Sequence, residues 1–222
     1  MTSSKHELVT KPENFILTVT NPTVTYVITN ITMTEDEAYI RDIIDNRSVV
    51  AYRALVEKYE NRVFTLCYKI VKGREEAEEV AQDTFVLCFK KLTELKELKK
   101  FPNWLMKIAY SKAIDHVRKK HIPRTDLDAV DESHIKDEQT PLKNAIVENR
   151  KAIINRAINE LEPVEASVIT LYYIQDIPIK EIAEITGLTL SNVKVKLFRA
   201  RHNLKVILST KLKDDLKDFI QD

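Results

Sequence analysis

The stretch Lys180-Glu-Ile-Ala-Glu-Ile-Thr-Gly-Leu-Thr-Leu-Ser-Asn-Val-Lys-Val-Lys-Leu-Phe-Arg-Ala-Arg201 has the pattern of two helices joined by a tight turn. Ala183 is small enough for a second helix to cross closely over it, and Val193 returns to the shared apolar face. Gly187 stands where the turn requires a positive φ, which glycine adopts without steric cost. The chain has only 2 glycines, so a glycine at this position is informative. The stretch predicts a helix-turn-helix.

The second helix of this pair begins after the candidate cap Thr189 and carries basic residues without an acid among them. A helix that enters the major groove needs such charge to meet phosphates. The alternative is a helical hairpin with a solvated basic face, but spacing, turn, cap and charge together favour DNA binding. With Val193, Leu197, Ala200 and Leu204 facing inward, the predicted DNA-binding residues are Ser191, Asn192, Lys194, Val195, Lys196, Phe198, Arg199 and Arg201.

The composition is that of a globular chain with one or two small domains and a formal net charge of +1. Cys67 and Cys88 lack metal-like spacing and fall at apolar positions of predicted helices, which indicates core residues in a reducing compartment. We find no apolar run that could span a bilayer and no signal-peptide core. We therefore expect a cytoplasmic protein without membrane insertion, and no metal or cofactor.

The predicted fold class is all-α: two helical domains joined by a flexible linker, the second containing the helix-turn-helix. Helical apolar stripes run through 33–120 and 142–208, separated by an acidic linker at 121–141 and followed by a solvated tail at 209–222. Gly73 and Pro102 mark helix boundaries in the first domain, and Pro163 marks one in the second.

The leader, residues 1–32, differs from the rest because Thr and Val alternate in it, a pattern that makes short strands. Thr34, with acids following it, is a good helix cap directly after Met33. Two interpretations stay open. The leader is translated upstream sequence before a natural start at Met33, or it is a disordered or interacting segment.

Two neighbouring helices of the first domain carry opposite charge. The helix after Gly73 is acidic in its first half, whereas the helix after Pro102 ends in a basic cluster. Opened DNA is held by cationic grooves and by flat surfaces on which bases stack. Trp104 and Tyr110 are candidates for such surfaces, although burial as a core anchor is the more common role of a tryptophan.

These segments together resemble the extracytoplasmic-function (ECF) group of bacterial sigma factors. The resemblance covers about Val50 to Leu208 and lies in three motifs: Glu76-Ala-Glu-Glu-Val-Ala-Gln-Asp-Thr-Phe85, the helix Phe101–Lys120, and Val193–Arg201. It implies a sigma region 2 at 33–120, which binds polymerase and the start-proximal promoter element. It also implies a sigma region 4 at 142–208, which binds the distant element.

The resemblance also implies partners and residue roles. The partners are core RNA polymerase, promoter DNA and an anti-sigma factor. In region 4, Lys194, Val195, Phe198 and Arg199 would read bases, while Lys196 and Arg201 would contact phosphates. In region 2 the predicted DNA-binding residues are Lys107, Ser111, Lys112, Asp115, Arg118, Lys119 and Lys120, and the predicted polymerase-binding residues are Glu76, Glu79, Gln82 and Asp83.

The chain is expected not to be an enzyme, because no carboxylate pair, nucleophile set, phosphate loop or metal cluster stands out in the sequence. Two rivals remain at this stage. One is a two-domain transcriptional regulator whose first domain binds a ligand or a protein. The other is a helical enzyme with an appended DNA-binding module. Binding to core RNA polymerase separates the three.

Overall fold

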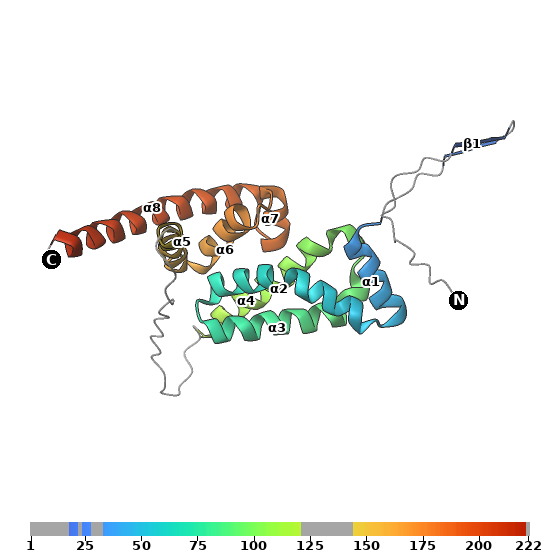
Figure 1. Cartoon of the computed structure of the whole chain (residues 1–222), viewed down its shortest axis with the longest axis horizontal. Coiled ribbons are helices and arrows are strands. Elements are labelled where there is room, and N and C mark those ends of the chain that lie inside the picture. Colours follow the sequence, from blue (N-terminus) through green and yellow to red (C-terminus); the bar gives the residue numbers. More distant parts are fainter. Residues whose placement is uncertain (1–17, 22–23, 28–32, 121–143, 221–222) are drawn as a thin grey trace, which may run out of the picture.

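The computed structural model describes residues 18–21, 24–27, 33–120 and 144–220, and it is predominantly helical (Figure 1). The predicted linker at 121–141 lies outside these residues, as does most of the leader. The described part of the leader is an antiparallel hairpin of β1 (Thr18–Asn21) and β2 (Val24–Val27), with Thr18 opposite Val27 and Asn21 opposite Val24. The Thr/Val alternation therefore does form short strands.

The first long helical region is built from α1 (Glu35–Asn46), α2 (Val49–Val71), α3 (Arg74–Lys91) and α4 (Phe101–Lys120), with the short 3-10 helices η1 (Leu92–Glu94) and η2 (Leu98–Lys100) between α3 and α4. We call α1–α4 the N-terminal region. Thr34 starts α1 as predicted. Its hydroxyl accepts from the Glu37 amide at 3.3 Å, and its own amide donates to the Glu37 carboxylate at 2.8 Å.

Helices α2, α3 and α4 pack against one another around a continuous apolar core. The predicted stripe is buried: Leu55, Val63 and Leu66 of α2 are at most 2% exposed. Cys67 and Cys88 belong to this core, and burial raises the pKa of both thiols to about 12. Their assignment as small core hydrophobes is therefore confirmed.

Gly73 lies at the boundary between α2 and α3, as predicted. Lys72 is the left-handed C-cap, with φ 71°, while Gly73 is the extended N-cap of α3, with φ −91°. The left-handed residue at this boundary is thus Lys72, and not the glycine that usually occupies such a position.

The second long helical region, α5–α8, is called the C-terminal region. It contains α5 (Asn144–Asn159), α6 (Pro163–Ile169), the π-helical turn η3 (Thr170–Ile174), α7 (Ile179–Thr186) and α8 (Leu190–Ile220). Pro163 begins α6, as predicted. The second helix of the predicted helix-turn-helix continues without a break into the tail after 208, so that α8 is one helix of 31 residues. Figure 1 shows α8 extending beyond the rest of the bundle toward the C-terminus.

The two regions pack directly against each other. Helix α6 contacts α2, and α7 contacts α4, so that one apolar core includes residues of both regions. Figure 1 shows α5–α8 lying along one side of α2 and α4. Two hydrogen bonds cross the boundary near α7: the Asn103 amide donates to the Glu181 carboxylate at 2.7 Å, and the Gln175 amide donates to the Arg62 carbonyl at 2.9 Å.

Candidate nucleic-acid interface

The helix-turn-helix predicted from Gly187 is present. Gly187 has φ 72° and closes α7, and its amide donates to the Ala183 carbonyl at 2.9 Å. A side chain at this φ would be strained, although nothing lies within 4 Å of its expected Cβ position. Thr189 caps α8, since its hydroxyl accepts from the Asn192 amide at 3.2 Å. The turn therefore fixes the direction in which α8 leaves α7.

Helix α8 has one buried and one exposed face. Val193 and Ala200 are 0% exposed and Leu197 is 4% exposed, so the inward stripe is the one expected from the sequence. On the opposite face, the apolar side chains Val195 and Phe198 are 44% and 67% exposed. The polar and basic positions predicted to face DNA are exposed with them, except for the half-buried Lys196: Ser191, Asn192, Lys194, Arg199 and Arg201.

This face has the chemistry of a base-reading surface. Long cations form bidentate contacts with guanine, and exposed apolar side chains contact the methyl group of thymine. Arg201 lies at its edge, where its Nε donates to the Leu197 carbonyl at 3.2 Å. That contact holds the guanidinium close to the helix and leaves its remaining N–H groups available to a phosphate.

Helix α4 presents a second exposed stripe. Lys107, Ser111, Asp115 and Arg118 are spaced so that they follow one face of the helix, and all are exposed. Arg118 and Asp115 form an ion pair at 3.4 Å. The stripe is therefore polar and mixed in charge, with Lys107 at one end and the exposed Lys119 beyond the other.

Other cations of α4 are paired with acids of α3, an arrangement that sequence reasoning missed. Lys112 lies 3.0 Å from Asp83, and Lys120 lies 2.7 Å from Glu76. His116 lies 4.0 Å from Glu76. The acidic and basic helices were interpreted as surfaces for separate partners, whereas part of each surface faces the other. Pairs as exposed as these contribute about 0–1 kcal/mol, so a phosphate or a polymerase cation could displace them.

The aromatic candidates of α4 are not open surfaces. Trp104 is half-buried against the core, with its ring centroid 6.3 Å from that of Phe101, which confirms its role as an anchor. Tyr110 is 9% exposed, and burial raises its pKa. Its interpretation as a platform for a splayed base is therefore wrong for this arrangement, because its ring packs inside the helical bundle.

The outer face of α3 combines charge with apolar side chains. Glu79 and Gln82 are exposed there, as predicted for a protein-binding surface. Val86 and Phe89, one and two turns further on, are 53% and 40% exposed. Exposed apolar residues rimmed by polar ones are typical of protein-binding sites. Sequence reasoning missed these two, although their spacing after Gln82 places them on the same side of the helix.

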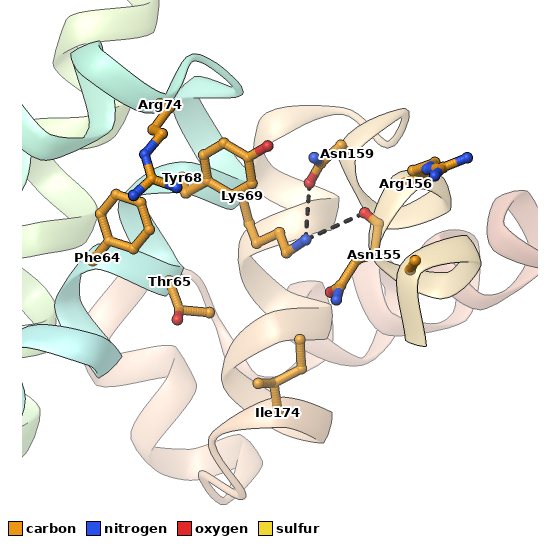
Figure 2. A pocket seen from close by; sticks show the side chains of 10 residues that line it. Phe64, Thr65, Tyr68, Lys69, Arg74, Asn155, Arg156, Asn159 and Ile174 are labelled. Carbon is orange, nitrogen blue, oxygen red and sulfur yellow. Dashed lines mark hydrogen bonds between the residues drawn. The ribbon is translucent and has the colours of Figure 1, made fainter. Parts of the chain in front are cut away.

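A pocket of about 480 Å³ lies where the two regions meet between α2 and α5 (Figure 2). Its most unusual group is Lys69, which is 4% exposed. The Lys69 ammonium donates to the Asn155 carbonyl at 3.2 Å and to the Asn159 side chain at 3.0 Å. Both acceptors are neutral, and desolvation lowers the Lys69 pKa to about 8.

Among the side chains that the structure describes, His, Cys, Asp and Glu do not gather in groups of three that could hold a metal ion. Within residues 33–120 and 144–220, no helix combines the length and apolar character needed to cross a membrane.

The comparisons with known proteins agree with this geometry. Residues 55–121 match the family "Sigma-70 region 2", and residues 151–204 match "Sigma-70, region 4". The ECF RNA polymerase sigma factor SigW of Bacillus subtilis is 28% identical over 164 residues, which cover 70% of this chain and 87% of the relative. The RNA polymerase sigma-H factor of Pseudomonas aeruginosa is 25% identical over 172 residues, covering 74% and 89%.

Two solved structures share the fold. CnrH, in complex with the cytosolic domain of CnrY, matches with a TM-score of 0.57 at 20% identity, covering 80% of this chain and 99% of CnrH. The sigma factor RpoE of Bartonella quintana, in complex with the anti-sigma factor NepR, matches with a TM-score of 0.55 at 16% identity, covering 72% and 98%.

The two sigma-70 regions follow one another in the chain, the second contains the helix-turn-helix, and the relatives are sigma factors. Together these findings define the class of protein as a promoter-specificity subunit of bacterial RNA polymerase. The chain belongs to the ECF group of sigma factors, which direct the polymerase to initiate transcription at specific promoters.

Proposed function

We propose that the exposed face of α8 binds the distant promoter element while α4 binds the opened start-proximal element. The observation that carries this assignment is the one-sided burial of α8. Val193 and Ala200 are fully buried, and the basic residues between them, Lys194 and Arg199, point away from the core. A helix fixed in this way can lay a basic, partly apolar surface into the major groove.

On α8 we assign base reading to Lys194, Val195, Phe198 and Arg199, and phosphate contacts to Lys196 and Arg201. On α4 the side chains that would contact DNA directly are the exposed ones: Lys107, Ser111, Asp115, Arg118 and Lys119. Lys112 and Lys120 would do so by exchanging their carboxylate partners on α3 for phosphates. Such an exchange is favourable because DNA carries a much denser line of negative charge than two surface carboxylates.

Core RNA polymerase is proposed to bind the outer face of α3 through Glu79 and Gln82, together with the exposed Val86 and Phe89. Glu76 and Asp83 would contribute less to this contact, because each is already paired with a cation of α4. RNA synthesis itself would remain the chemistry of the polymerase, and the chain would act in the cytoplasm.

An anti-sigma protein is proposed as a further partner. One of the two similar structures is a sigma factor bound to an anti-sigma factor. The chain would be held inactive by such a protein until a signal releases it, and α3 or α8 would then become available.

Reconstitution tests this function. Core RNA polymerase is mixed with the full chain, and holoenzyme is followed by gel filtration and by run-off transcription from genomic fragments. We expect a stable complex and new start sites that share two upstream elements. Failure to form the complex would reject the assignment in favour of a regulator that acts on DNA alone.

A further inference from the structure

The pocket between α2 and α5 is lined by three cationic side chains and is separate from the surfaces assigned to DNA and polymerase (Figure 2). Lys69 extends from α2, Arg74 stands at the start of α3, and Arg156 lies on α5. Among the lining side chains that the structure describes, none is an acid. At about 480 Å³ the pocket has the size of a small-molecule site.

Lys69 is the most buried of the three cations. It is 4% exposed, and its two acceptors, the Asn155 carbonyl and the Asn159 side chain, are both neutral. An ammonium has three N–H donors, so within the described part of the chain one stays available to a further acceptor. A charge that is removed from water without a counter-charge is costly, and an anion in the pocket would reduce that cost.

Two aromatic rings follow Lys69 along one wall of the pocket. The Lys69 ammonium lies 5.5 Å from the centroid of the Tyr68 ring, which stacks on the Phe64 ring with 5.8 Å between centroids. The Arg74 guanidinium lies 5.9 Å from the centroid of the Phe64 ring, and its pairing with Glu78 at 3.0 Å uses one of its five N–H donors. Aromatic rings beside cations are the combination that holds a base together with its phosphate.

The side chains of the pocket indicate the class of ligand. Three cations exceed the charge of a single carboxylate, whereas a phosphate group carries close to two negative charges and offers three acceptor oxygens. The rings favour a flat unsaturated group attached to that phosphate. Thr65 and Asn155 add polar side chains that can form hydrogen bonds with a sugar or with the edge of a base.

We propose that this pocket binds a nucleoside phosphate, with a phosphate at Lys69 and the base against Phe64 and Tyr68. Arg74 and Arg156 are exposed at the rim and can turn toward the phosphates. The inference is independent of the proposed function, because none of these residues is assigned to promoter DNA or to polymerase. Since both helical regions line the pocket, the bound nucleotide would contact both and stabilise the folded chain.

Titration calorimetry with the full chain tests the class of ligand. The probes are ADP, GDP, inorganic pyrophosphate and adenosine, in a buffer without phosphate or divalent cations. We expect at least one of the two nucleotides to bind at one molecule per chain, pyrophosphate to bind about ten-fold more weakly, and adenosine more weakly still. Pyrophosphate binding as tight as that of the nucleotides would overturn the role of the rings. Binding of neither nucleotide would overturn the inference.

Competition with a short oligothymidylate distinguishes a free nucleotide from a nucleotide unit of a DNA strand. We expect the oligonucleotide not to displace the bound nucleotide at equal concentration, because the pocket encloses a single ligand. Displacement would assign the pocket to a nucleic-acid strand and overturn the inference.

Variants locate the site. Lys69→Met removes the buried ammonium, and Arg156→Gln removes an exposed cation whose loss leaves the core unchanged. We expect nucleotide binding to weaken about ten-fold in the first and about three-fold or more in the second. The matched control is Lys90→Gln, at an exposed position in the last turn of α3, at the opposite end of that helix from Arg74.

Circular dichroism spectra verify that each variant is folded before its affinity is compared. Weakening of the same size in Lys90→Gln would show an effect of general charge and overturn the inference. Unchanged affinity in Arg156→Gln and in a folded Lys69→Met would place the nucleotide elsewhere and overturn it as well. Because run-off transcription is not part of this test, its result leaves the inference unaffected and is decided separately.

Discussion

The two surfaces assigned to promoter DNA differ in how much of the protein already touches them. On α8 the basic face is open, and Phe198 is 67% exposed there. On α4 the corresponding stripe lies beside α7, and its flanking cations Lys112 and Lys120 pair with α3. In the proposed function, the exposed face of α8 would meet double-stranded DNA without rearrangement. Opened DNA on α4 would instead displace the ion pairs with α3 and approach the turn after α7.

The largest expected effect concerns the proposed polymerase contact on α3. Glu79→Lys reverses an exposed charge in the middle of α3 and should abolish holoenzyme formation, because α3 would then repel a cationic partner surface. Gel filtration with core polymerase measures this. Glu75→Lys, at an exposed position in the first turn of α3, is the matched control. Equal loss with both variants would mean that general charge, not the Glu79 position, governs binding.

The open surface of α8 should divide into two kinds of residue. Lys194→Ala and Arg199→Ala should cost about 1–3 kcal/mol each on the matched distant element and little on a scrambled duplex, since they would lose contacts with bases. Lys196→Ala and Arg201→Ala should weaken binding to both duplexes and lower the salt slope by roughly one unit. Salt titrations on the two duplexes decide this. If Lys194→Ala weakens both equally, the assigned groove face is incorrect.

The burial of Lys69 at the junction between the two regions should make the stability of the fold depend on pH. In the folded chain the Lys69 pKa is about 8, below the ordinary 10.5, so Lys69 binds fewer protons in the folded chain than in the unfolded chain between these values. The contribution of Lys69 to stability should therefore rise with pH above about 8, by up to about 1.4 kcal/mol per pH unit. The penalty for burying the charged amine is fully present below pH 8.

Urea unfolding of wild type and of Lys69→Met between pH 7 and 9.5 isolates this contribution as the difference between the two. The buried Cys67 and Cys88 thiols, whose raised pKa values lower the stability above about pH 9, are common to both proteins and cancel in that difference. The other ionisable side chains that line the Lys69 pocket are Tyr68, Arg74 and Arg156. The upper limit of pH 9.5 avoids the buried Tyr52 and Tyr59, whose raised pKa values oppose the trend at higher pH. A rise of the same size in Lys69→Met would assign the effect to another group.

The smallest effect concerns the turn between α7 and α8. Gly187→Ala places a side chain at φ 72° and should destabilise the fold by about 1–2 kcal/mol through backbone strain, because no clash awaits the new methyl group. Gly73→Ala is the control, since φ is −91° there and the new Cβ meets only the flexible Glu76 side chain. Thermal unfolding compares them. A larger loss for Gly73→Ala would contradict the strain argument.

The sequence was sufficient wherever local chemistry decides the structure. Gly187, Thr34 and Thr189 act at the turn and caps expected of them, and the stripe Val193, Leu197 and Ala200 is buried as its spacing predicts. These features depend on neighbours within four residues along the chain, so periodicity and capping rules are enough to predict them.

What the sequence could not predict depends on contacts between distant segments. The pairing of Glu76 with Lys120, the burial of Lys69 between α2 and α5, and the contact of Glu181 with Asn103 each join different helices. A lysine inside an apolar stripe gives no sign of its acceptors, and two regions linked by an acidic segment give no sign of how they pack. The covered state of α4 therefore emerged only from the structure.

The most direct test of the account is in vitro transcription from a library of genomic fragments, using core RNA polymerase with and without the chain. The account predicts discrete start sites that appear only when the chain is present and that share a start-proximal and a distant element. Lys194→Ala should weaken discrimination at the distant element alone. Start sites that are the same with and without the chain, despite a holoenzyme that forms normally, would contradict it.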